Sequence, residues 1–317
     1  MKHKIYRKWL FLLAYVVVLV SPSVASADAT DGGGHHRGPE AAEIEAEISL
    51  IGVGDAKSSV GNASVGTAGV IIETEYEKNN MVFSFGYERW KYNWTNPENL
   101  PFISGTTANP WSTFNTLQFG FGYEQEINDQ WELVYIVEAE SSFEKETSGS
   151  NEYELGIDIE YKPSESWAFV VNMNYEYLDA DGGELGMDLE IMWNHHSKEG
   201  WSGEFEISSE FPESSLTYHF TRAFSTTLFY ADGGTSTIRL ANDTPVTGMQ
   251  GGYLEDEYQS IGTRFSYELA HESYLSFSIQ KNFNRQLAFI DGTGSEVETN
   301  YSFEDAIGAT LSYELQF

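Results

Sequence analysis

The sequence predicts an all-β protein: a transmembrane antiparallel up-and-down β-barrel of about fourteen strands, with twelve as the alternative. Three observations favour this fold. Apolar and polar residues alternate with a period of two along most of the chain. The alternating segments have about ten residues, the length that crosses a bilayer at a tilt. The connections between them are alternately short and long, as in barrels with tight turns at one end and loops at the other.

The N-terminal segment has the three parts of a secretory signal peptide. Basic residues within Lys2–Lys8 precede an apolar stretch from Trp9 to Val20, and the small residues Ala25–Ala27 follow. Because the apolar stretch is shorter than the roughly 20 residues of a spanning helix, we expect cleavage after Ala27, with an uncleaved anchor as the alternative. The expected division is a signal peptide at 1–27, a flexible Gly-rich leader at 28–40 and an outer-membrane β-barrel at 41–317.

The composition restricts the possible functions. Removing the signal peptide takes away four of the 17 Lys and Arg and none of the 49 Asp and Glu, so the formal net charge changes from −32 to −36. So acidic a chain is not expected to bind nucleic acid, whose phosphates require clusters of Lys and Arg. Aromatic residues make up 15% of the sequence, too many for a disordered polyelectrolyte. With no cysteine in the sequence, neither a disulfide framework nor a lipid-attachment Cys is expected.

Alternation is clearest in "AEIEAEISL", which begins at Ala42, and in "YELGIDIEY", which begins at Tyr153. Successive side chains of a strand point to opposite faces, so one face of each segment is apolar and the other is acidic. Alternation is also typical of a soluble sandwich, so strand length, aromatic strand ends and connection length decide for the barrel. The expected strands are 42–53, 66–77, 81–94, 113–126, 131–143, 151–161, 166–178, 184–194, 200–210, 214–222, 225–240, 256–270, 273–289 and 303–317.

The strand number is expected to be even, because both ends of such a barrel lie in the periplasm. The weak point is "EFPESSLTYHF", where Pro212 marks either a turn between two strands or a kink inside one. An even count favours the turn, and therefore fourteen strands. The connections expected at the cell exterior are 94–113, 143–151, 178–184, 240–256 and 289–303.

The signal peptide, the alternating strands and the closing Phe317 together resemble Gram-negative outer-membrane β-barrel proteins. In those proteins a last strand that ends in an aromatic residue is recognised by the barrel-assembly machinery. The stretch "FPESSLTYHFTRAFSTTLFYADGGTSTIRL", with "YQSIGTRFSYELAHESYLSFSIQKNF" and "SFEDAIGATLSYELQF", further resembles an uncharacterised outer-membrane barrel family known only as a domain of unknown function. The likeness covers most of residues 41–317. It implies an outer-membrane location, outer-membrane lipid and the assembly machinery as partners, and Phe317 as the assembly signal.

The polar faces of the strands are expected to line a hydrated, acidic lumen. Eight strands leave an interior filled by side chains and sixteen to eighteen leave an aqueous channel, so fourteen lies between. Because carboxylates cannot be buried dry and unpaired, water or basic residues such as Arg264 and Lys281 must reach them. The expected lumenal acidic residues are Glu73, Glu75, Glu138, Glu140, Glu154, Asp158, Glu160, Asp188, Glu190, Glu204 and Glu206.

This lumen favours a narrow, porin-like diffusion channel that prefers small cationic or neutral solutes. The alternative is a non-conducting structural or adhesive barrel that acts through its outer loops. An outer-membrane hydrolase is less favoured, because only His219 lies on a strand and no motif ties a Ser or a carboxylate to it. The pairs His35–His36 and His195–His196, and His271, fall in polar leader or turn segments. The segment "DADGGE" departs from a calcium-loop signature, and no catalytic residue, cofactor or metal is expected.

Overall fold

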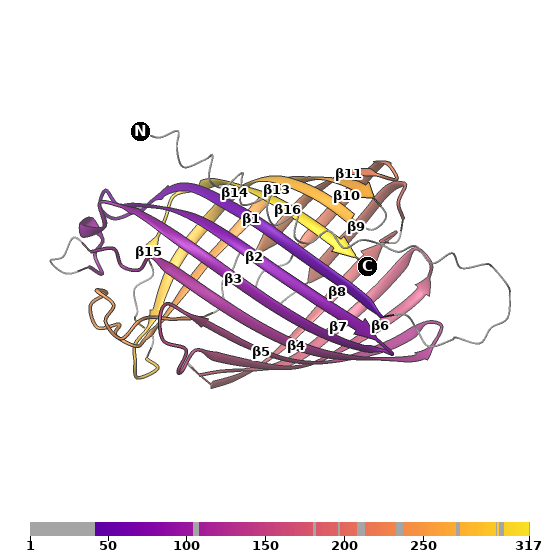
Figure 1. Cartoon of the computed structure of the whole chain (residues 1–317), viewed down its shortest axis with the longest axis horizontal. Coiled ribbons are helices and arrows are strands. Elements are labelled where there is room, and N and C mark those ends of the chain that lie inside the picture. The colour runs from indigo at the N-terminus through magenta and orange to yellow at the C-terminus, as the bar shows by residue number, and fades with distance from the viewer. Residues whose placement is uncertain are drawn as a thin grey trace. The chain divides into compact units, whose positions relative to one another are not determined.

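The wall of the barrel is an antiparallel sheet of fourteen strands in the computed structural model (Figure 1). The structure describes residues 42–103, 108–179, 182–195, 197–207, 213–232, 237–270, 273–295, 297 and 301–316. The signal peptide, the leader and Phe317 lie outside these residues. Among the described residues, no helix is long and apolar enough to cross a membrane.

The strand bounds follow the sequence expectation closely at most positions. The wall strands are β1 Glu43–Lys57, β2 Ser64–Lys78, β3 Met81–Thr95, β4 Thr113–Asn128, β5 Trp131–Phe143, β6 Asn151–Ser164, β7 Trp167–Leu178, β8 Gly182–Trp193, β9 Gly200–Ile207, β10 Ser214–Thr221, β11 Phe224–Asp232, β13 Tyr253–Ala270, β14 Ser273–Ile290 and β16 Ala306–Gln316. Three short elements lie outside the wall, namely η1 Pro97–Asn99, β12 Ile238–Arg239 and β15 Tyr301–Ser302.

The sheet closes on itself, which removes its free edges. Strand β1 pairs with both β2 and β16, β16 pairs with β14, and β14 pairs with β13. Strands β9 and β10 pair antiparallel on either side of the link that contains Pro212, with Ser214 opposite Phe205. The predicted antiparallel barrel and its count of fourteen are therefore confirmed, although Pro212 itself lies outside the described residues.

The links at the two ends of the barrel differ in length. At one end, the short-link end, they are 79–80, 129–130, 165–166, 194–199, 222–223 and 271–272. Asn79 and Asn80 both have positive φ, 53° and 64°, as a type I′ hairpin between Lys78 and Met81 requires. At the other end, the long-link end, the links are 58–63, 96–112, 144–150, 179–181, 208–213, 233–252 and 291–305. The alternation of link lengths thus follows from an even, up-and-down strand order.

The outer surface of the wall is apolar. Leu155 and Leu185 are 57% and 79% exposed. In a water-soluble protein, exposed fractions this high are typical of polar side chains. Similar exposed apolar side chains occur on most wall strands: Ile72, Phe83, Phe119, Val137, Tyr175, Ile207, Phe220, Leu228, Phe265, Phe277 and Ile307. Aromatic pairs such as Trp131–Tyr161, with ring centroids 4.5 Å apart, lie near the short-link end. This band with an aromatic rim is the surface that a bilayer covers in transmembrane barrels.

Strand β12 joins two distant parts of the wall. It pairs antiparallel with β13, Arg239 opposite Tyr253, and parallel with β5, Arg239 opposite Phe143. The Glu144 amide also donates to the Arg239 carbonyl at 2.9 Å. In the wall, β6 to β11 lie between β5 and β13. Because β12 pairs with both β5 and β13, it bridges these two distant strands at the long-link end. The predicted strand 225–240 is therefore wrong beyond Asp232, since the residues of β12 leave the wall.

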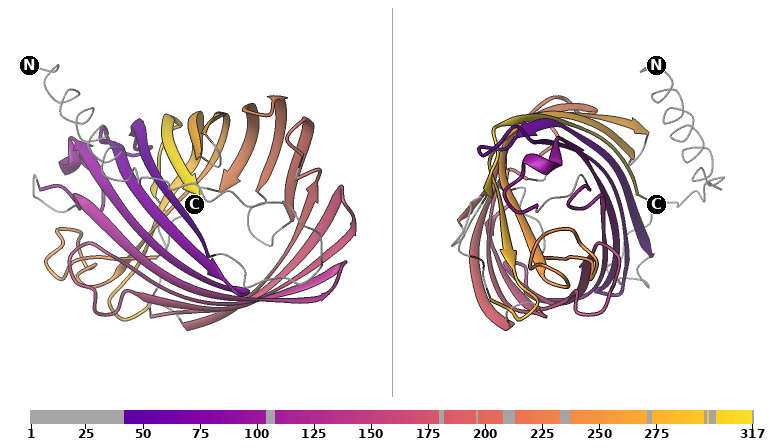
Figure 2. Two further views of the ribbon diagram at one scale, coloured as in Figure 1. Left: turned by 45° about the vertical axis from the view of Figure 1, so that its right-hand side comes forward. Right: turned by 90° about the vertical axis from the view of Figure 1, so that its left-hand side faces the viewer.

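A packed apolar cluster lies at the long-link end. Figure 2, right, shows η1 and the link before β13 lying across the mouth of the barrel there. We call this cluster the cap, and its residues are Leu100, Phe102, Ile103, Trp111, Phe114, Ile238, Leu240, Val246, Met249, Leu254, Leu287 and Phe289. Trp111, Phe114, Leu240 and Leu254 are at most 1% exposed. The described residues of the links, 96–103, 108–112 and 237–252, therefore contribute to a small hydrophobic core rather than forming solvated loops.

Candidate functional site

The inner face of β1 to β5 carries a dense group of carboxylates. Glu73, Glu75 and Glu138, three of the residues predicted to be lumenal, line one cavity of about 290 Å³ together with Glu45 and Glu47. The side chain of Gln118 donates from Nε2 to Glu138 Oε2 at 3.0 Å. Apart from Phe85, the remaining lining residues are polar or small, including Ser84 and Gly86. This wall of the lumen therefore presents negative charge with few neutralising partners.

Carboxylates also oppose one another directly across strands β5 to β7. Glu138 faces Glu154, which in turn faces Glu176, and Glu140 faces Glu152. Like charges at directly opposed positions destabilise a sheet unless water or a counter-charge separates them. Ser142 donates to Glu140 Oε1 at 2.9 Å, which is a hydrogen bond without neutralisation. The rows therefore require hydration or bound cations.

One row near the short-link end has its own cation. Lys162 Nζ lies 2.7 Å from Glu160 Oε2 and 3.0 Å from Glu132 Oε2, and Glu132 and Glu160 are cross-strand partners. Glu160 was predicted to be lumenal. Its charge is balanced in part by Lys162, which also pairs with Glu132.

The remaining predicted residues lie on β6, β8 and β9. Asp158 accepts a hydrogen bond from Asn172 Nδ2 at 2.6 Å, and Asn172 lies opposite Asp188 in the sheet. A second cavity, of about 460 Å³, is lined on one side by Glu190, Glu204 and Glu206. The predicted set is thus distributed over a broad sector of the wall rather than gathered at one constriction.

Several further acidic residues lie on the same face of their strands as the predicted lumenal residues, but were not among those predicted. Glu47 accepts from Ser49 Oγ at 2.6 Å, Glu88 accepts from Trp90 Nε1 at 2.8 Å, and Glu314 lines a cavity with Glu47. The signal was present, because these residues belong to the same alternating segments. Other residues missed in this way are Glu45, Glu132, Glu152 and Glu176.

The opposite sector of the lumen, from β10 to β1, carries hydroxyl groups. One cross-strand row joins Ser49, Ser312, Ser276, Ser266 and Ser225. A second row joins Thr310, Ser278, Arg264, Thr227, Thr217 and Ser202. We call these two rows the hydroxyl face. The lumen therefore has an acidic sector and a sector lined mainly by hydroxyl groups, with the Arg264 guanidinium among them.

The two basic residues expected to serve the lumen differ in position. Arg264 belongs to the hydroxyl face and lines two cavities. Lys281 has the strand parity of the exposed Ile279, and its Nζ pairs with Asp305 at 2.6 Å. The expectation that Lys281 reaches the lumenal carboxylates is therefore wrong, because its parity places it on the outer face of β14.

A buried ionic group borders the cap. Arg285 donates to Asp256 from Nε at 2.8 Å and from Nη2 at 2.5 Å, and the Tyr92 hydroxyl donates to Asp256 Oδ2 at 3.0 Å. The guanidinium also lies 5.9 Å from the ring centroids of Tyr92 and Phe303. Such a network holds neighbouring elements in one arrangement, because each buried group would be costly to leave unpaired.

The residues with catalytic potential are isolated. His219 lies on β10 opposite Ser225 of β11 and Gly200 of β9. Within the described part of the chain, neither a Ser hydroxyl nor a carboxylate hydrogen-bonds to its imidazole. Among those residues there is also no group of three or more His, Asp or Glu positioned to hold a metal ion. His35, His36, His196 and His271 lie outside the described residues.

Comparison with known proteins gives distant structural likenesses. No protein-family model and no curated protein matches the chain. The solved structures it resembles include the toluene transporter TodX of P. putida, at 8% identity and a TM-score of 0.47, with 88% of this chain and 91% of that chain covered. A Pseudomonas aeruginosa FadL homologue has 11% identity and a TM-score of 0.42, with 87% and 89% covered.

The porin KdgM, solved with disordered oligogalacturonate, has 9% identity and a TM-score of 0.36, with 86% of this chain and 99% of that chain covered. All of these are outer-membrane β-barrels.

Proposed function

We propose that this chain is an outer-membrane channel whose water-filled lumen favours small cations over anions. The observation that carries the proposal is the set of opposed carboxylates, Glu138–Glu154–Glu176 and Glu140–Glu152, on the inner wall. Such rows are tolerated where water or cations reach them. A field of one sign between low-dielectric walls raises the local cation concentration and excludes anions.

The location follows from the two surfaces of the barrel. The exposed apolar band with its aromatic rim suits lipid, and the hydrated inner face suits a lumen. Export by the expected signal peptide supports an outer-membrane location with the long links at the cell exterior. Membership in the uncharacterised barrel family stays a prediction, as does recognition of Phe317 by the assembly machinery.

The cap favours a second candidate function, a barrel that does not conduct and acts through its outer surface. Its core residues Trp111, Leu240 and Leu254 are packed as tightly as a protein interior. We infer that conduction requires the cap to move, so the channel is gated at its long-link end.

Single-channel recording in planar bilayers tests the proposal against the alternative. Refolded barrel, verified by heat-modifiable gel mobility, should give discrete openings in potassium chloride. Absence of conductance from correctly folded protein, also when the cap is destabilised by mutation, would leave the non-conducting barrel.

A further inference from the structure

Among the residues that the structure describes, the lumenal cation Arg264 forms no salt bridge with a carboxylate. It lies in the second row of the hydroxyl face, between Ser278 and Thr227. Its guanidinium carbon lies 5.6 Å from the centroid of the Phe229 ring, which supports one face of the group. Among the described residues, no side chain forms a hydrogen bond or an ion pair with the guanidinium. Because Arg presents five N–H donors in a fixed fork, this side chain has unused capacity for a bidentate ligand.

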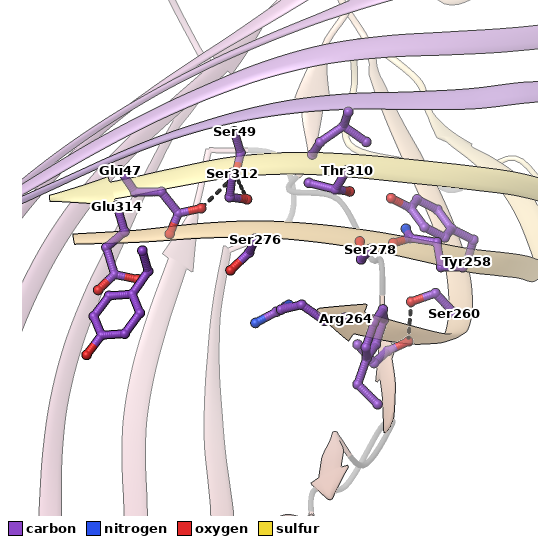
Figure 3. Close-up of a pocket in the computed structure, with 15 residues that line it drawn as sticks. Glu47, Ser49, Tyr258, Ser260, Arg264, Ser276, Ser278, Thr310, Ser312 and Glu314 are labelled. Atoms are coloured by element: carbon purple, nitrogen blue, oxygen red, sulfur yellow. Dashed lines mark hydrogen bonds between the residues drawn. The ribbon is translucent and has the colours of Figure 1, made fainter. Parts of the chain in front are cut away.

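Two cavities of the lumen meet at Arg264. The first, of about 320 Å³, is also lined by Glu47 and Glu314 and by the hydroxyl-bearing residues Ser276 and Thr310 (Figure 3). The second is the cavity of about 460 Å³ that Glu190, Glu204 and Glu206 line. Volumes of this order accommodate a small molecule. A solute that contacts Arg264 therefore has carboxylates on the wall of the same cavity.

From this arrangement we infer that the lumen holds a binding site for a small zwitterionic solute, of the α-amino acid class. The solute carboxylate accepts two hydrogen bonds from Arg264, the geometry that a guanidinium favours. The solute ammonium donates to Glu314 or Glu47, and polar substituents contact Ser276, Ser278 or Thr310.

The charges that line the cavity should favour a zwitterionic solute over related solutes that carry only one charge. A simple cation gains nothing from Arg264 and has many carboxylates elsewhere in the lumen. A simple anion is attracted by Arg264 but is repelled by Glu47 and Glu314. A zwitterion satisfies both sets of groups, and the hydroxyl face adds hydrogen bonds that do not depend on charge. The inference deepens the proposed function, because it assigns a solute class to the same lumen.

Equilibrium dialysis on the folded barrel in detergent tests the site without requiring conduction. The probes are L-serine, ethanolamine, which lacks the carboxylate, and lactate, which lacks the ammonium. Serine should bind at least about tenfold more tightly than either relative, a factor that corresponds to about 1.4 kcal/mol. Arg264→Gln should weaken serine binding by a similar factor. The matched control is Arg222→Gln at the exposed short-link end, where Arg222 pairs with Glu199 at 3.3 Å, and it should leave binding unchanged.

A second variant keeps the test valid if Arg264→Gln does not fold. The double variant Glu47→Gln/Glu314→Gln should weaken serine binding and leave lactate binding equal or stronger, because it removes only the partners of the ammonium. Equal serine binding in the folded Arg264→Gln barrel, equal binding of ethanolamine or lactate, or no serine binding by unmodified barrel would overturn the inference. If the barrel binds serine but never conducts, the binding site is supported and the proposed channel function is wrong. If the barrel conducts but does not bind serine, the channel function is supported and the binding site is wrong.

Discussion

Arg285 and Asp256 form a bidentate ion pair at the edge of the cap, with side chains that are only 8% and 1% exposed. The pair joins β14 to β13, and Tyr92 of β3 adds a hydrogen bond to the same carboxylate. Strands that lie apart in the wall order are thereby joined through one buried group at the long-link end. The arrangement of the cap therefore depends on whether this group stays intact.

Breaking one side of the pair should destabilise the barrel strongly. Arg285→Met leaves the buried Asp256 carboxylate without its guanidinium partner, and breaking a buried ion pair in this way costs about 3–5 kcal/mol in comparable sites. The free energy of unfolding, measured by denaturant titration of the folded barrel, should fall by that amount. The double variant Asp256→Leu/Arg285→Met should recover most of the loss, since it removes both charges. Arg222→Met, at an exposed pair, is the control; an Arg285→Met barrel as stable as this control would contradict the assigned role.

Weakening the apolar packing should open the channel more often. Trp111 contacts Trp94 edge-on at 5.2 Å between ring centroids and stacks on Phe102 at 6.1 Å. Trp111→Ala leaves a cavity that costs about 3–5 kcal/mol in well-packed cores. Single-channel recordings should show a higher open probability than those of unmodified protein. Trp167→Ala, on the exposed band at the other end of the barrel, should not change it, and equal open probabilities for both variants would argue against a gating role for the cap.

The contact between the link 144–150 and the residues after β12 should depend on pH. Burial raises the pKa of Glu144, although the backbone hydrogen bond from Ala241, 3.1 Å from Oε2, acts in the opposite direction. A raised pKa in the folded state means that the contribution of Glu144 to the stability of this region is greatest below the ordinary pKa of Glu, about 4.3. The contribution is lost as the pH rises through the higher folded-state value.

Replacing Glu144 with Gln should therefore protect the Ala241 region from amide exchange at neutral pH and change little in acid, where the carboxyl is already protonated. Hydrogen exchange measured at both pH values reports the difference. Glu146→Gln, on the same link, is the matched control. Stronger protection of the unmodified protein at neutral pH than in acid would show that the sign is wrong.

Phe317 should matter more for assembly than for stability. It follows Gln316, the last residue of β16, in the sequence, and the resemblance assigns it a recognition role. Deleting Phe317 should lower the yield of folded barrel in outer-membrane fractions while leaving unfolding in vitro nearly unchanged. Gel mobility with and without heating measures the folded fraction. Unchanged yield in cells would remove the recognition role.

Much of the wall could be predicted from the sequence because strand periodicity is local. The segment from Glu154 to Glu160 alternates so regularly that its acidic face follows directly from side-chain geometry. Strands such as Trp131–Phe143 accordingly have the predicted bounds. The up-and-down order that the link lengths indicate also requires an even number of strands. An even number favours a turn at Pro212, which separates β9 from β10.

The cap could not be predicted in this way, because its residues are close in space and distant in sequence. Leu240 and Trp111 come from two different links and belong to one buried cluster. The apolar residues around Ile238 and Leu240 were interpreted as the continuation of a wall strand, since a short apolar run does not reveal whether it packs in a sheet or against other links. The pairing of Lys281 with Asp305, rather than with a lumenal acid, likewise depends on tertiary position.

The selectivity of the lumen for cations is tested most directly by a reversal potential across a potassium chloride gradient. The account predicts a potential of the sign set by potassium, which should shrink when Glu138 and Glu154 are both changed to Gln, because these opposed carboxylates carry much of the lumenal field. The preference should also weaken at high salt, as the Debye length falls from about 10 Å at 0.1 M to about 3 Å at 1 M. A potential of the sign set by chloride in the unmodified protein would contradict the account.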